Sequence, residues 1–144
     1  MKSLQNQKRT ILLAPAVAAT ATRSASLLDT LGADYATIEV AVGARVAATQ
    51  ASTVTIAITE GDVATGSFVT FNADMSKAIA IGTAAQVAAF HINLDGTRKR
   101  YLSVLSTPGT VASADAIAVA VIGVLDSEIS PLGTVGQADV VVIG

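Results

Sequence analysis

Apolar and polar residues alternate strictly in two stretches of the chain, Tyr35–Val42 and Thr53–Thr59. Successive side chains of a β-strand point to opposite faces, so this alternation predicts strands with one buried face. The predicted inward residues are Ala36, Ile38, Val40, Val42, Val54, Ile56 and Ile58. Shorter β-rich segments, separated by turns with Gly, Pro and Asp, are predicted as further strands at 10–19, 67–71, 78–81 and 140–143. This pattern predicts an all-β fold, a small sandwich or barrel.

Composition narrows the classes of function. Hydrophobic residues make up 51% of the 144-residue chain, aromatic residues 3% and charged residues 14%, against about 25% charged in an average domain. A surface so poor in charge suggests either that other subunits cover much of it or that Ser and Thr supply the missing polarity. The net charge of −2 argues against nucleic-acid binding. Cysteine is absent, which excludes disulfides, thiolate metal sites and a cysteine nucleophile. No stretch approaches the ~18 unbroken apolar residues of a membrane span.

The N-terminal residues predict an extended arm and then a short helix. Residues 1–22 are interpreted as the arm, and residues 23–144 as a single β-rich domain. Within the arm, Ile11–Ala19 could pair with the sheet edge of a neighbouring subunit or belong to the chain's own barrel. Pro15 confines such a strand to an edge. Ser24–Gly32 is predicted as a helix of about two turns, capped by Ser24 or Ser26 and ended by Gly32.

The segment Gln86–Ser106 is predicted as one β-hairpin. Ala88, Phe90, Ile92 and Leu94 would share one face, and Asp95–Gly96 is a strong signal for the tight turn. The return strand begins with the densest basic cluster of the chain, Arg98, Lys99 and Arg100. This cluster is interpreted either as a solubilising group or as an electrostatic contact to a protein partner.

Residues Asp115–Leu125 are apolar at nearly every position. Their β-branched composition favours a strand over a helix. A strand with two apolar faces is either central in a sheet or sealed by a neighbouring subunit.

Catalytic and ligand-binding motifs are weak throughout. His91 is the only histidine and stands mid-strand, with no G-x-S-x-G motif to present a serine nucleophile. Glu60, Asp62 and Asp74 match no calcium-loop spacing. The segment Gly133–Gly136 lacks the features of a phosphate-binding loop and is interpreted as a turn. We therefore expect no enzymatic activity, no cofactor and no metal.

Two segments carry a resemblance to a known family. SASLLDTLGADYATIEVAV (Ser24–Val42) and GTRKRYLSVL (Gly96–Leu105) resemble small head decoration, or cement, proteins of tailed bacteriophages. The resemblance extends over residues 24–125. It implies a jelly-roll or β-tulip-like subunit, often trimeric, that is made in the host cytoplasm. Such subunits bind the exterior of the expanded head and bridge neighbouring major capsid proteins, with no nucleic-acid or membrane partner.

The resemblance also suggests which residues meet the capsid. Lys8 and Arg9 of the arm would meet the acidic outer face of the shell. The complete set of predicted partner-binding residues is Lys8, Arg9, Ile11, Leu12, Leu13, Arg98, Lys99 and Arg100. Two alternatives stay open: another small virion β-protein, such as a tail or connector subunit, and a receptor- or glycan-binding surface module.

Overall fold

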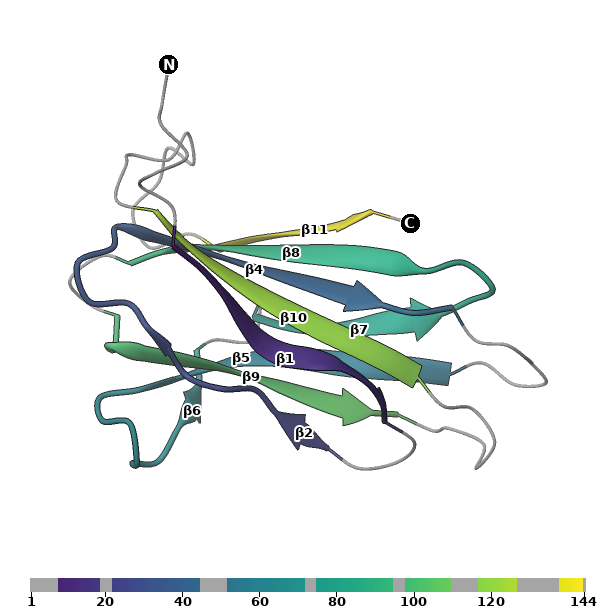
Figure 1. Ribbon diagram of the computed structural model, residues 1–144, viewed down its shortest axis with the longest axis horizontal. Helices are drawn as coiled ribbons and strands as arrows, with labels where there is room; N and C mark the ends of the chain where they lie inside the picture. The colour runs from purple at the N-terminus through teal and green to yellow at the C-terminus, as the bar shows by residue number, and fades with distance from the viewer. Residues whose placement is uncertain are drawn as a thin grey trace, which may run out of the picture.

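Two antiparallel β-sheets face each other across an apolar core (Figure 1). The computed structural model describes residues 8–18, 22–44, 52–71, 75–94, 98–109, 117–126 and 138–143. Within this part of the chain the secondary structure is strand, with no α-helix. The prediction of an all-β sandwich is therefore confirmed.

The first sheet, sheet A, has the strand order β1-β10-β4-β8-β11, and all its neighbours are antiparallel. Its strands are β1 (Lys8–Ala18), β4 (Tyr35–Val42), β8 (Gln86–Asn93), β10 (Ile117–Asp126) and β11 (Ala138–Ile143). Sheet B follows the order β2-β9-β5-β6, with β3 also pairing β9 and β7 also pairing β5. Its strands are β2 (Arg23–Ser24), β3 (Leu28–Asp29), β5 (Ser52–Gly61), β6 (Val69–Thr70), β7 (Ser76–Ile81) and β9 (Tyr101–Pro108).

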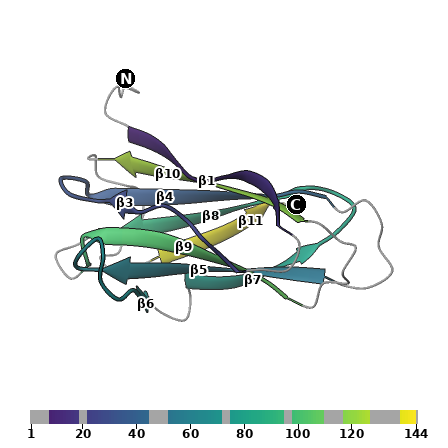
Figure 2. The same ribbon diagram turned by 60° about the horizontal axis from the view of Figure 1, so that its bottom comes forward.

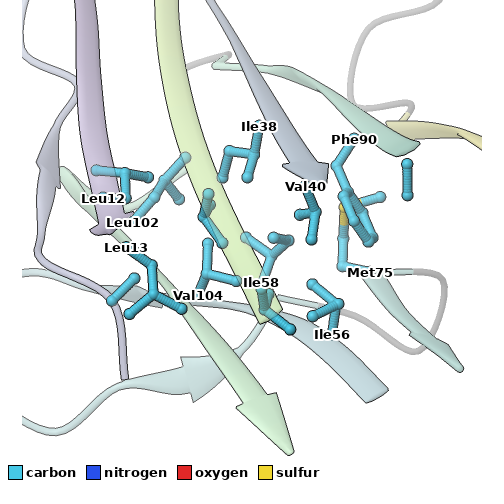
Figure 3. Packing of buried hydrophobic residues seen from close by; sticks show 14 of the residues in the cluster. Leu12, Leu13, Ile38, Val40, Ile56, Ile58, Met75, Phe90, Leu102 and Val104 are labelled. Carbon is cyan, nitrogen blue, oxygen red and sulfur yellow. The ribbon is translucent and has the colours of Figure 1, made fainter. Parts of the chain in front are cut away.

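The core lies between the two sheets, where side chains from both meet (Figure 3). All seven inward residues predicted from alternation in β4 and β5 are buried. In β8, Ala88, Phe90 and Ile92 are fully buried as predicted, and Leu94 packs at the margin of the core. Aliphatic side chains pack around the fully buried ring of Phe90, and this burial of apolar surface stabilises the fold.

β10 lies between β1 and β4, so the apolar stretch is a central strand, the first of the two predicted alternatives. Gly123 of this strand has a packing role. A Cβ atom there would lie 3.0 Å from side-chain carbons of both Leu12 and Leu28. Glycine thus lets β1 and the segment around β3 pack closely against the centre of sheet A.

The predicted helix over Ser24–Gly32 is wrong. This segment forms β2 and β3, which both pair with β9. Its N–H groups donate to neighbouring strands instead of along a helix: the Ala25 N–H donates to the Val104 carbonyl of β9 and the Ser26 N–H to the Leu12 carbonyl of β1, both at 2.8 Å. Leu28 is 2% exposed and Leu31 73%, so the leucines share no apolar helical face. A two-turn helix gains little by itself, and pairing with a sheet edge replaces it.

The predicted hairpin over Gln86–Ser106 is also wrong. β8 pairs with β4 and β11 in sheet A, whereas β9 pairs with β5, β2 and β3 in sheet B. The connection between them therefore crosses from one sheet to the other. The predicted turn residues Asp95 and Gly96 lie outside the described residues, as do Asp74 and the segment 133–136.

β1 pairs along its length with β10 of the same chain. The structure thus places the described part of the arm in the chain's own sheet, the second of the two predicted alternatives. The register of β1 shifts between Ile11 and Leu13 and again between Leu13 and Ala16. Such bulges change which way successive side chains point, and the consecutive residues Leu12 and Leu13 are both buried. Residues 1–7 and 19–21 lie outside the described part.

Candidate partner-binding surfaces

The predicted basic cluster lies where the crossover from sheet A enters sheet B. Tyr101, the first residue of β9, pairs with Asp29 of β3 on one side and with Gly61 of β5 on the other. The ends of β3 and β5 therefore flank the segment 98–100. Both ribbon views show the β3–β4 and β5–β6 connections leaving the sandwich at this same end (Figures 1 and 2).

Arg100 forms a two-pronged ion pair with Asp29. Its Nε donates to Asp29 Oδ1 at 2.9 Å and its Nη2 to Oδ2 at 2.8 Å. The hydrogen bonds from Arg100 are the main cause that lowers the pKa of Asp29 from its ordinary 3.8 to about 2. The same pairing raises the pKa of Arg100. Planar, bidentate geometry of this kind holds both side chains in one orientation.

Arg98 and Lys99 are bound by carboxylates at the end of β5. Glu60 is only 7% exposed. It accepts the Lys99 backbone N–H at 3.2 Å and lies 3.9 Å from Arg98 Nη1. The Arg98 guanidinium also lies over the Phe71 ring, 4.2 Å from its centre. Lys99 Nζ reaches Asp62 at 3.0 Å. The buried Glu60 carboxylate requires such partners, so its contacts with Arg98 and Lys99 fasten the crossover to sheet B, whereas Asp62 is exposed.

The three predicted basic residues are therefore brought together, but each lies against a carboxylate of its own chain. Pairing of this kind cancels much of the positive potential that would attract an acidic partner. The geometry thus supports a structural role for the cluster. That a partner's charge also contacts it stays a prediction.

The predicted residues of β1 divide between surface and core. Lys8, Arg9 and Ile11 are exposed, with Ile11 at 66%. Leu12 and Leu13 are 2% and 7% exposed and belong to the core cluster. Because their side chains are packed inside this chain, they are not available to contact a capsid subunit. Their role is to seal the edge of sheet A against sheet B (Figure 3).

Ile11 lies in a cross-strand row on the outer face of sheet A that contains both apolar residues and one carboxylate. It pairs with Ile122 of β10, which pairs with Glu39 of β4, which pairs with Ala89 of β8. Ile122 is 36% exposed, and Val87 of β8, on the same face, is 45% exposed. Ile122 and Val87 are not among the partner-binding residues predicted from the sequence. Each is an apolar residue at an outward position of a predicted strand, and that pattern could have identified both.

His91 also faces outward on sheet A. Its Nδ1 and the hydroxyl of Thr37 on the neighbouring strand β4 are hydrogen-bonded at 3.2 Å. A histidine bonded to a threonine on an open sheet face is a cross-strand pair of the kind that stabilises sheets.

Within the described ranges, no group of three or more His, Cys, Asp or Glu side chains is placed to hold a metal ion. Over the same ranges, no helix has the length and apolarity needed to span a membrane. Comparison of the chain with protein-family models, curated proteins and solved structures found no match.

Proposed function

We propose that this chain is a structural subunit of a tailed-phage virion, which binds the exterior of the head and bridges neighbouring major capsid proteins. The observation that carries the proposal is the outer face of sheet A, where Ile11, Ile122 and Val87 are exposed. The resemblance of Ser24–Val42 and Gly96–Leu105 to phage decoration proteins supplies the partner. Self-association, as a trimer, is part of the same proposal.

The size of the face fits a repeated, modest contact. Five strands about 4.8 Å apart, each roughly eight residues long at about 3.4 Å per residue, make a face of about 500 to 600 Å². Covering it with a partner buries about 1,000 Å² in total, near the lower limit for a specific interface. Many such contacts on a symmetric shell reinforce one another, because each bound subunit raises the effective concentration of the next contact.

The alternative of a glycan-binding module receives less support. Sugar recognition commonly uses aromatic rings that stack on the sugar, and the exposed large apolar residues of the described chain are all aliphatic. Flat aliphatic faces suit protein surfaces better than hydrated sugars.

Co-sedimentation tests the proposal. The purified chain is mixed with expanded heads assembled from the major capsid protein of the same virus, and bound copies are counted by densitometry. We expect saturation at a fixed ratio to the capsid protein, in hundreds of copies per head. Six or twelve copies would indicate a connector or tail subunit instead. The absence of binding would contradict a role on the head.

A further inference from the structure

Leu31 is the most exposed large apolar residue in the described part of the chain, at 73%. It lies in the turn between β3 and β4, where the Ala33 N–H donates to the Thr30 carbonyl at 3.0 Å. Gly32 has φ +80°, while Leu31 does not have positive φ. A positive φ at the third position alone defines a type II turn. Leu31 therefore occupies the second position, at the tip.

Hydrogen bonds on both sides hold this turn in one conformation. The Leu31 N–H donates to Asp29 Oδ1 at 3.1 Å, and Asp29 is itself held by Arg100. Thr30, 7% exposed, donates to the Arg100 carbonyl twice, from its N–H at 2.9 Å and from its hydroxyl at 2.6 Å. Leu31 thus projects from a turn whose geometry is set before any partner arrives. An anchor that is already ordered loses less conformational entropy on binding.

The charges around the turn indicate the chemistry of the partner. Arg98, Lys99 and Arg100 are paired with Glu60, Asp62 and Asp29, so the basic groups at this end are balanced within the chain. An acidic partner surface would meet basic groups whose charge these pairs already largely neutralise. An uncharged apolar pocket would receive Leu31 without disturbing them. Removing the exposed leucine side chain from water into such a pocket is favourable in itself.

We propose that Leu31 is a preformed apolar anchor that inserts into an uncharged apolar pocket on the major capsid protein, as a second contact besides the outer face of sheet A. This inference rests on the proposed function, because it names the same partner. It differs in assigning the contact to a turn at the end of the sandwich and in making that contact independent of charge.

The test measures binding of the full-length chain to expanded heads for wild type, Leu31→Ser, Val63→Ser and Gly32→Ala, each at low and high salt. Val63 is the matched control, because it is 57% exposed on the β5–β6 connection at the same end. Gly32→Ala leaves Leu31 in place but strains the turn, since a Cβ there meets nothing within 4 Å and acts only through φ. Thermal unfolding of each variant verifies that it is folded.

We expect Leu31→Ser to weaken binding about tenfold or more, with an unchanged unfolding midpoint and little effect of salt. Gly32→Ala is expected to weaken it by a smaller factor, and Val63→Ser to bind like wild type. Wild-type affinity in Leu31→Ser or in Gly32→Ala overturns the inference. An equal loss of affinity in Val63→Ser also overturns it. So does a difference between wild type and Leu31→Ser that disappears at high salt. Failure of the wild-type chain to bind heads overturns the proposed function, and the anchor with it.

Discussion

The two sheets of the sandwich contribute to one core but present different outer faces. On sheet A the outer face carries the aliphatic residues Ile11 (66% exposed) and Ile122 (36% exposed) beside polar residues such as Glu39. The outward residues of the central strand of sheet B are mainly hydroxyl-bearing: Thr53, Thr55 and Thr59. Alternation alone makes one face of each strand apolar, so the contrast lies in what occupies the other face.

Polar side chains on both sheets form hydrogen bonds within the chain, as Thr37 and His91 do on sheet A. On sheet B, the Thr59 hydroxyl donates to the Ser103 carbonyl at 3.3 Å, and the Ser103 hydroxyl donates to the Ala25 carbonyl at 3.2 Å. These hydroxyls are satisfied by the chain itself or by water. The aliphatic groups on sheet A have no such means of being stabilised in water. Under the proposed function, sheet A is the face that the partner covers.

The largest expected effect is on the free energy of unfolding. In the core that both sheets share, a substitution in either sheet should destabilise the fold to a similar extent. Phe90→Ala in sheet A should lower the free energy of unfolding by about 3 to 5 kcal/mol, and Ile58→Ala in sheet B by about 2 to 5 kcal/mol. Both residues are fully buried. Urea unfolding followed by circular dichroism should show one cooperative transition for each variant. Separate transitions for the two sheets would show that they do not form one unit.

A charge placed on the outer face of either sheet tests whether the two faces differ in their contribution to binding heads. Ile122→Lys on sheet A should weaken binding to expanded heads about tenfold or more, because a desolvated charge would enter the interface. Thr55→Lys is the matched control on sheet B, since both positions are outward and β-branched on central strands. Equal affinities of the two variants, measured by co-sedimentation, would remove the distinction between the faces.

The smallest effect concerns pH and the edge of sheet B. The pKa of Asp29 is lowered from 3.8 to about 2 in the folded chain. The stabilisation from its ion pair is therefore complete above about pH 4 and is lost as the pH falls toward 2. Thermal unfolding across this range should show a modest loss in wild type. Asp29→Asn should show less of it, and an identical pH profile in the variant would contradict the assignment.

Alternation predicted the strands β4 and β5 and their buried faces because it reports a local property, the direction of each side chain. It could not predict pairing. Gln86–Ser106 has strong hairpin signals, yet β8 and β9 lie in different sheets, since each finds better partners elsewhere in the chain. The segment Ser24–Gly32 has helical signals, and long-range pairing with β9 replaces the helix.

The residues of the candidate surfaces were likewise only partly predictable from the sequence. Ile11, Lys8 and Arg9 were predicted at the surface and are exposed, whereas Leu12 and Leu13 are buried by bulges that no local pattern reveals. The basic cluster was visible in the sequence. Its partners Glu60 and Asp29, however, lie 39 and 71 residues away from Lys99 and Arg100. The exposure of Leu31 became evident only from the turn at Gly32.

By itself, then, the sequence determined the all-β class, the inward faces of the central strands and the low surface charge, because these follow from residue type and period. Tertiary structure decided which strands pair, which charges cancel and which apolar groups stay exposed. Those outcomes depend on contacts between segments far apart in the chain, whose energies compete only when the whole sandwich is assembled.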